Sequence, residues 1–299
     1  MAPPASPVVA RWELALRLRE RRIERGISVR DLSVHMDFKP SYWSMVQNEK
    51  TLLGQKKLDE VIEYFEFDDV EAAELRQLNI DARNRGWWED LRTPIRNLER
   101  FLGLEQGAKS MRVFEGSVIT GMLQTDRYAR AIVGLHPAMG SIDVEPHVRL
   151  RQLRRRRLFE DDPLELVCVM SEAALVQQVG GVDVLAEQLQ YLVDIEADPV
   201  TNIRFHVVPF AVTPGVMIQM TTVAIYGFES RYLPDAYVLE ELGDMKQIDV
   251  SDHKKLSEYS LAFDQALELA LSHENSMEVI ASHAVGFQEL GAAFLDRWH

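Results

Sequence analysis

Apolar residues in the N-terminal part of the chain recur every three or four positions, which is the spacing of one helix face. Leu14 and Leu18 share a face of the first predicted helix, and Gly26 is placed to end it. The Pro- and Ala-rich residues 1–10 are expected to be disordered. The pattern predicts an all-α domain over residues 11–85 with helices at 11–25, 28–36, 40–48, 55–67 and 68–86.

The second and third of these helices carry their own start and stop signals. Ser28 is a suitable N-cap, with Asp31 three residues further on as a loose capping-box partner. The sequence "DFK" breaks the helix after Met36, and Pro40 suits the first turn of the next one. Two short helices joined by a tight break are typical of a helix-turn-helix.

The pattern changes in the second part of the chain, residues 95–299, which we expect to form an α+β domain with a small mixed sheet and a helical tail. Strands are expected where β-branched, apolar runs end at Gly or Pro: 110–116, 164–170, 202–210, 216–228 and 236–242. Helices are expected between and after them: 123–135, 145–161, 182–197, 251–272 and the tail 273–299. The segment 86–97 is predicted to be a linker or a docking segment.

Residues 28–48 divide into an inward and an outward set. The predicted shared core consists of Leu32, Met36, Phe38, Trp43 and Val46. The residues expected to contact DNA bases or backbone are Ser28, Arg30, Lys39, Ser41, Tyr42, Ser44, Met45, Asn48 and Lys50. Arg22 also flanks this face. The alternative is a plain helical bundle whose basic residues are only solvated.

Charge is distributed unevenly along the 299 residues. Residues 1–64 hold 11 Lys and Arg against 9 Asp and Glu, whereas the remainder holds 22 against 38, a net of −16. An acidic body repels nucleic acid, so contact with double-stranded DNA is expected from the N-terminal domain alone. The chain has a single cysteine, Cys168, which is what a protein of the reducing cytoplasm is expected to show. We predict that Cys168 is a small buried residue rather than a nucleophile. No apolar run is long enough for a membrane span, and we expect a cytoplasmic, nucleoid-associated protein.

The stretch "LRERRIERGISVRDLSVHMDFKPSYWSMVQNEK" resembles the Xre or phage-repressor type of helix-turn-helix. It departs from that pattern in three places. Asp37 stands where a turn glycine is usual, Val29 replaces a common Gln, and Gln47-Asn48-Glu49 replaces a Glu-x-Gly close. Asp tolerates the left-handed conformation that such a turn requires.

A second resemblance covers residues 95–272. "VITGMLQTDRYARA", "RLRQ", "MSEAALVQQVGG", "QLQYLVDI" and "IRFHVVPF" follow the order of segments in actinobacterial Xre regulators of the WhiJ-like, antitoxin-like kind. Thr120 and Ser171 depart from that family's Pro and Asp. The resemblance implies a regulator that senses a ligand or a small partner protein encoded nearby.

Candidate residues for binding a ligand or partner in the second domain are Gly121, Gln124, Thr125, Arg151 and Glu172. A glycine allows close backbone approach, and the Gln and Thr side chains can form hydrogen bonds. The alternative is that Gln124 and Thr125 only fix a corner between loop and helix. Six arginines within 149–157 indicate either a second nucleic-acid or phosphate contact or, preferably, a surface helix whose arginines pair with the surplus acids of the body, those at 160–162 among them.

The sequence offers few residues that could carry out catalysis. The acid/base candidates on or beside strands are Glu172, His206, Glu240 and Glu241, and no pattern typical of a metal site or a nucleophile elbow is present. We therefore expect no cofactor, no metal and no enzyme activity. The leading hypothesis is a sequence-specific transcriptional regulator. The alternatives are an antitoxin-like module that neutralises a partner and autoregulates, and a DNA-tethered enzyme.

A homodimer is expected, because one such motif buries too little surface on DNA for strong specificity. The helix 251–272 offers apolar residues for the dimer contact: Leu256, Leu261, Phe263, Leu267 and Leu271. Alternatively, this helix only packs on its own sheet and the tail supplies the contact through Phe287, Leu290 and Phe294.

Overall fold

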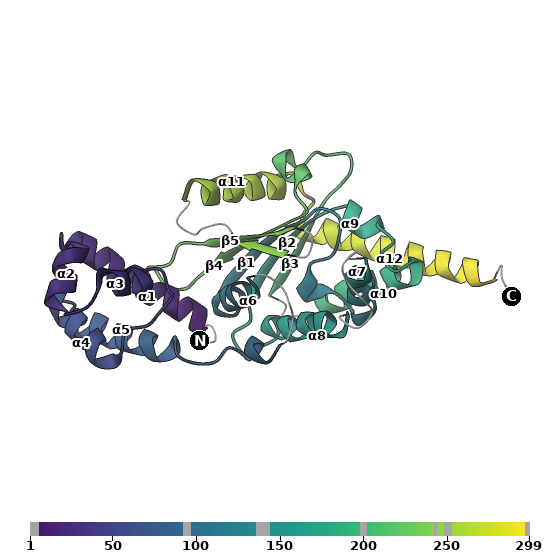
Figure 1. Cartoon of the computed structure of the whole chain (residues 1–299). Helices are drawn as coiled ribbons and strands as arrows, with labels where there is room; N and C mark the ends of the chain where they lie inside the picture. Colours follow the sequence, from purple (N-terminus) through teal and green to yellow (C-terminus); the bar gives the residue numbers. More distant parts are fainter. Residues whose placement is uncertain are drawn as a thin grey trace.

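A computed structural model of the protein describes residues 6–91, 97–135, 144–197, 202–241, 244–247 and 253–296. The N-terminal part is helical throughout (Figure 1). Its elements are α1 (Pro7–Glu24), α2 (Val29–His35), α3 (Pro40–Gln47), α4 (Gln55–Tyr64), α5 (Asp69–Asp81) and the 3₁₀ turn η1 (Trp87–Asp90). The five predicted helices are therefore confirmed.

The second part combines helices with one mixed sheet, as expected. Its helical elements are α6 (Leu98–Gly107), η2 (Gly121–Leu123), α7 (Asp126–Gly134), α8 (Val144–Arg155), η4 (Arg156–Leu158), α9 (Ala173–Val176), α10 (Val182–Glu196), η5 (Gly215–Gln219), α11 (His253–Leu269) and α12 (His273–Asp296). Its strands are β1 (Ser110–Glu115), β2 (Glu165–Ser171), β3 (Ile203–Val208), β4 (Thr222–Gly227), β5 (Ala236–Glu241) and β6 (Asp244–Gln247).

The six strands lie in the order β3-β2-β1-β4-β5-β6. β1, β2 and β3 are parallel neighbours, and β4, β5 and β6 continue the sheet as an antiparallel meander from the other side of β1. The parallel strands need helical crossovers, and the chain supplies them through α7, α8 and α10. β6 and α6 were not expected from the sequence, and the run 216–228 proves to be η5 followed by β4 rather than one strand.

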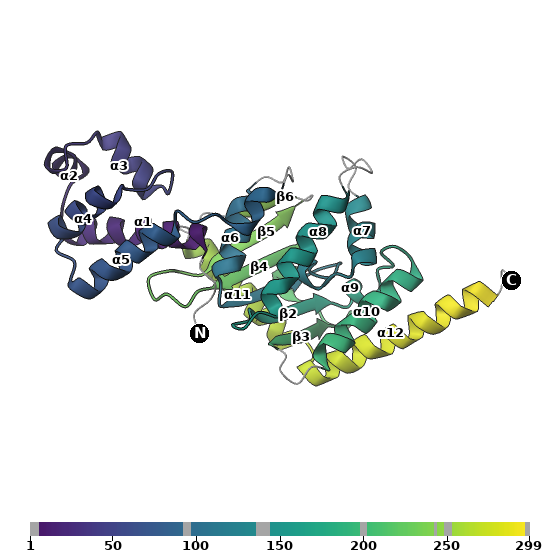
Figure 2. The same ribbon diagram turned by 90° about the horizontal axis from the view of Figure 1, so that it is seen from below.

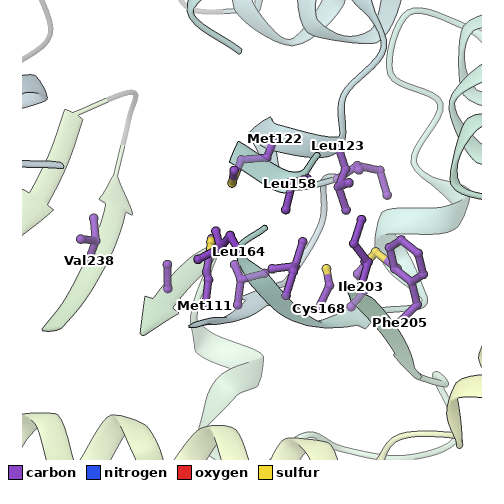
Figure 3. Packing of buried hydrophobic residues seen from close by; sticks show 14 of the residues in the cluster. Met111, Met122, Leu123, Leu158, Leu164, Cys168, Ile203, Phe205 and Val238 are labelled. Carbon is purple, nitrogen blue, oxygen red and sulfur yellow. The ribbon is translucent and has the colours of Figure 1, made fainter. Parts of the chain in front are cut away.

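Alternate residues of each strand enter two separate cores. Met111, Cys168 and Phe205 point to the larger core, which α6, α8 and α10 cover (Figure 3). Phe114 and Val169 point to the opposite face, which α11 covers. Cys168 is fully buried, and burial raises the pKa of its thiol well above the ordinary value, so it acts as a small core residue.

Most of the apolar face of helix α11 packs against the sheet of its own domain. Phe263 is fully buried there, Leu256 and Leu267 pack against the same core, and Leu261 is 61% exposed. Helix α12 lies beside α10 and β3, and its C-terminal end projects from the body on the side away from α1–α5 (Figure 2). Val285 and Leu290 on this helix are exposed.

One helix belongs to both parts of the molecule. The C-terminal half of α1 places Leu14 and Leu18 in the N-terminal core, whereas its first half places Val8 and Trp12 in the large core of the sheet domain. Ser6 caps this helix, and its hydroxyl donates to the carbonyl of Gly103, 2.6 Å away. The expectation that residues 1–10 are disordered is thus wrong for the described residues 6–10, because their apolar side chains find a partner distant in sequence.

Candidate nucleic-acid interface

Helix α2 begins as its sequence predicts. The Ser28 hydroxyl oxygen accepts a hydrogen bond from the backbone N–H of Asp31 at 3.1 Å. The same hydroxyl donates to the Asp31 carboxylate at 2.6 Å. Ser28 and Arg30 are both exposed at this end of the helix. Because α2 is only seven residues long, such a cap stabilises a large fraction of it.

The break between α2 and α3 has the left-handed residue that the sequence led us to expect. Asp37 has φ of 51°, and the N–H of the following Phe38 donates to the carbonyl of Ser33 at 3.1 Å. Lys57 on α4 closes the same helix end, since its ammonium donates to the carbonyl of Met36 at 2.8 Å. Sequence reasoning missed Lys57, because nothing in the chain signals a contact across 21 positions.

The inward set predicted for this segment is buried. Leu32 and Trp43 have no exposed surface, and Met36 and Val46 have 2% and 4%. Phe38 is half-buried and its ring stacks on that of Trp43, with centroids 6.1 Å apart. The apolar residues therefore hold α2 and α3 as one unit against α4 and α1.

The outward face of α3 is polar and exposed. We define the α3 surface as the exposed residues Lys39, Ser41, Ser44, Met45 and Asn48. Tyr42 belongs to its margin, because its half-buried ring packs edge-on against Phe38 at 5.6 Å. The Asn48 amide donates to the carbonyl of Ser44 at 2.7 Å, so this group also caps the end of α3. Lys50, just beyond, is exposed.

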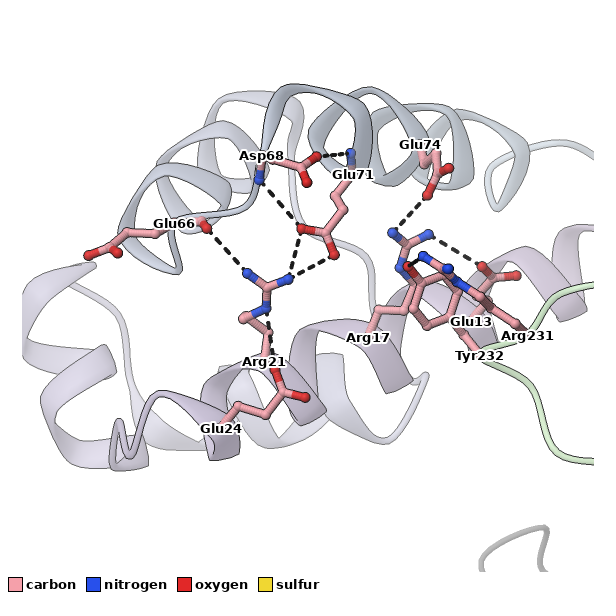
Figure 4. Close-up of polar contacts among 10 residues, drawn as sticks. All are labelled: Glu13, Arg17, Arg21, Glu24, Glu66, Asp68, Glu71, Glu74, Arg231 and Tyr232. Carbon is pink, nitrogen blue, oxygen red and sulfur yellow. Dashed lines mark hydrogen bonds and ion pairs between the residues drawn. The ribbon is translucent and has the colours of Figure 1, made fainter.

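Contacts within the protein hold three arginines at the C-terminal end of α1: Arg21, Arg22 and Arg25. The Arg22 guanidinium donates to the carbonyl of Ile27 at 2.6 Å and fixes the turn into α2. Arg21 forms two hydrogen bonds to the Glu71 carboxylate, at 2.7 and 2.8 Å (Figure 4). Arg25 pairs with Glu66, whose pKa this hydrogen bond lowers. Arg22, which we expected to flank the DNA face, serves here as an internal brace.

An ion pair ties the end of α3 to the sheet domain. Glu49, which has φ of 60°, accepts hydrogen bonds from both terminal nitrogens of Arg100 on α6. The Arg100 guanidinium also lies over the ring of Trp12, 5.4 Å from its centroid. The position of α3 is thereby connected to α6 and α1.

A second contact between the two parts lies along α1 (Figure 4). The Arg17 guanidinium bridges Glu13 and Glu74 at 3.5 and 2.8 Å and lies 4.0 Å over the ring of Tyr232. Tyr232 belongs to the loop between β4 and β5. Burial raises the pKa of Glu13, and hydrogen bonds from Ser230 and Arg17 offset part of this rise.

The candidate ligand residues around 121–125 come together as a structural corner. The Gln124 amide donates to the carbonyl of Ile119 at 2.6 Å, and its oxygen accepts from Arg151 at 2.8 Å. Thr125 caps α7, and its N–H donates to Gln188 at 2.7 Å. A side chain at Gly121 would meet the guanidinium of Arg154 at 2.9 Å. These contacts favour the corner role that we set against ligand binding.

Glu172 lies apart from this corner, at the end of β2. Its carboxylate accepts from the N–H of Phe210 at 2.8 Å and stands 3.8 Å from the His283 ring. The His206 ring contacts the carbonyl of Leu271 at 3.0 Å. The side chains of Glu240 and Glu241, the other acids named with them, lie outside the described residues.

Most of the arginine run 149–157 is paired. Arg154 forms a bidentate bond to Glu105, Arg155 donates to the carbonyl of Gln124, and Arg157 donates to three backbone carbonyls. The prediction of a surface helix paired with acids is therefore confirmed only for part of this run: Arg154 pairs with Glu105, and Arg155 stands near Asp126. Arg154 and Arg157 are buried rather than on the surface, and Arg151 and Arg157 chiefly bind an amide oxygen and backbone carbonyls. Its acids come chiefly from α6 and α7 rather than from residues 160–162.

Among the described residues, no cluster of His, Cys, Asp or Glu is arranged to hold a metal ion, and none of the described helices could cross a membrane. Residues 98–282, more than half of the chain, match a family described as "Domain of unknown function (DUF5753)". No curated protein and no solved structure matches the chain.

Proposed function

The chain belongs to the DUF5753 family, and from this premise we propose that it is a sequence-specific DNA-binding transcriptional regulator. In Actinobacteria this domain often follows an Xre-type helix-turn-helix. The observation that carries the proposal is the exposed, polar α3 surface on a helix whose other side is fully buried against α2. In this proposal α2 and α3 form the helix-turn-helix.

The α3 surface would enter the major groove with its N-terminal residues on base edges. Lys39 can donate to the O6 and N7 atoms of guanine, and the Met45 side chain can touch a thymine methyl. Ser28 and Arg30 at the start of α2 and Lys50 after α3 would hold phosphates on either side. Since Arg21 and Arg25 are engaged by acids and Arg22 by a backbone carbonyl, we assign the phosphate contacts to Ser28, Arg30 and Lys50.

Two copies of the motif are needed for tight binding in this proposal. A single motif buries roughly 600–1,000 Å² on DNA, and the remainder of the chain carries a net charge of −16 that opposes it. A two-fold dimer would place two α3 helices about 34 Å apart, or a multiple of that distance, on a palindromic site. Because α11 is largely occupied by its own sheet, we assign the dimer contact to the projecting end of α12.

The test is DNA binding by the full chain after selection of a preferred site from random duplexes. Replacing Lys39 by Ala should cost about 1–3 kcal/mol on the preferred site and relax the base preference at one position. Lys254→Ala removes the same charge from α11 and should leave affinity unchanged. If no sequence is enriched, or if Lys39→Ala weakens preferred and random DNA equally, α3 does not read bases.

A second candidate function, an antitoxin-like module that binds a partner protein, is favoured by one observation. The connection between β3 and β4 exposes three large apolar side chains, Phe210, Val216 and Ile218, each more than 60% accessible. Such residues are typical of a protein contact when they gather in one segment. The two functions are compatible, since a partner seated there would leave the α3 surface free.

A further inference from the structure

A cavity of about 430 Å³ lies beneath the arginine run and is distinct from the α3 surface. Its walls come from three segments: η1 and the residue after it, α6, and the end of α8 with η4. This volume falls in the range of roughly 300–1,000 Å³ that is usual for small-molecule sites. The cavity also lies where the helices of the N-terminal part lead into the sheet domain, a common place for ligands.

The acids that line this cavity are already engaged. Glu105 is bound by Arg154 through two hydrogen bonds of 2.8 Å. Asp90 pairs with Arg85 at 3.3 Å, and Glu160 lies 3.7 Å from Arg157. Arg157 is buried, and the loss of solvent lowers its pKa. Its nitrogens donate to the carbonyls of three residues, so the hydrogen-bond donors of this guanidinium are taken up within the protein.

Two further arginines line the cavity without such partners. Arg149 and Arg156 are both exposed, and neither guanidinium forms a hydrogen bond or ion pair with any residue in the described part of the chain. They stand seven positions apart along α8 and η4, about two helical turns, and both contribute to the same cavity. The cavity thus carries two uncommitted guanidinium groups, which are the preferred donors for carboxylate and phosphate oxygens.

The rest of the lining is largely apolar. Trp87 is half-buried, and its indole N–H donates to the side chain of Gln106 at 3.1 Å, which satisfies its polar group and orients the ring. Leu91, Leu102 and Leu153 line the cavity with it. A ligand seated here would meet aromatic and aliphatic side chains as well as cationic groups.

We propose that this cavity binds a small anion with a flat apolar body, with Arg149 and Arg156 holding a carboxylate, phosphate or sulfonate group beside the apolar wall of Trp87. Such an anion would be the ligand that the proposed regulator senses, so the regulatory role of the cavity rests on the proposed function. Binding itself requires no DNA. Because η1 follows α5 closely in the chain, such a ligand would lie beside the connection between the two parts of the molecule.

The test uses the full chain and two fluorescent probes that differ mainly in one charge. 1-Anilinonaphthalene-8-sulfonate carries an anionic group on a flat apolar body, and N-phenyl-1-naphthylamine is its uncharged counterpart. We expect saturable binding of the sulfonate at one site per chain. The double variant Arg149→Gln, Arg156→Gln should weaken the sulfonate at least about tenfold and leave the uncharged probe nearly unchanged. Trp87→Leu should weaken both probes.

A matched control removes two arginines elsewhere. Arg127 and Arg130 are exposed residues of α7 outside this cavity, and their double replacement by Gln should leave sulfonate binding intact. Equal loss in this control, or wild-type affinity in the Arg149, Arg156 variant, would overturn the proposal. Since the probes are measured without DNA, Lys39→Ala should bind them normally, which separates failure here from failure of the proposed function.

Discussion

The buried ion pair between Arg154 and Glu105 offers the sharpest test of the energetics of the sheet domain. Their side chains are only 8% and 3% exposed, and two hydrogen bonds of 2.8 Å join them. The Arg154 guanidinium also lies 4.5 Å from the centroid of the Phe101 ring, and the Tyr226 hydroxyl stands 3.3 Å from Glu105. We consider the replacement of Arg154 by Met, which keeps much of the side-chain volume.

The expected loss follows from what the replacement leaves behind. Arg154→Met leaves the Glu105 carboxylate buried without its cation, a situation that costs about 3–5 kcal/mol. Adding Glu105→Leu removes the stranded charge, so the double variant should be more stable than the single one, even though it lacks both ionic groups. The two replacements are therefore strongly non-additive.

Urea unfolding followed by circular dichroism measures both effects. A surface pair supplies the control: Arg127 and Glu187 are joined at 2.6 Å, but their side chains are 55% and 43% exposed. Breaking that pair with Arg127→Met should cost under about 1 kcal/mol. The reasoning is refuted if Arg154→Met costs no more than this control, or if the double variant at 105 and 154 is the less stable.

Two further predictions concern assembly and pH. Val285→Lys with Leu290→Lys should shift the full chain toward monomer in sedimentation, whereas Leu261→Lys on α11 should not; a monomeric wild type at tens of micromolar contradicts the dimer. Burial raises the folded-state pKa of Glu13, so its stabilising contribution is present below the unfolded pKa and is lost as pH rises through the raised value. Thermal unfolding should therefore show wild type losing stability relative to Glu13→Gln as pH rises above the ordinary pKa of a Glu, about 4.3, and parallel curves would contradict this.

Local signals carried most of what the sequence could predict. The cap at Ser28, the left-handed Asp37 and the apolar spacing located α2 and α3 and their core within one or two residues. The contacts that could not be predicted join distant positions. The Ser6 hydroxyl reaches Gly103 across 97 residues, and Arg100 reaches Glu49 across 51. Neither short-range periodicity nor composition encodes such pairs.

The prediction of one continuous strand over residues 216–228 was wrong for a related reason. The apolar run 216–228 looks continuous, but Gly215 has φ of 59° and starts a 3₁₀ turn, so only its second half joins the sheet. The inward set of 28–48 was correctly separated from its outward set, whereas Arg22 was not, since a guanidinium bound to a carbonyl and one facing solvent have the same sequence signature. The cavity beside Trp87 is lined by residues from three separate segments, so no contiguous sequence motif could predict it.

Because α1 packs in the cores of both parts, the N-terminal part is poorly suited to being exchanged between proteins as a separate domain. This helix of 18 residues, about 27 Å long, is a structural member of two cores at once. A chimaera that joined residues 11–85 to another protein would carry off the part of α1 that includes Trp12 and leave a hole under Phe228, whose ring contacts that indole edge-on at 5.4 Å. Recombination between such proteins would have to transfer α1 together with the residues that pack around it in both cores. The two parts would therefore evolve together.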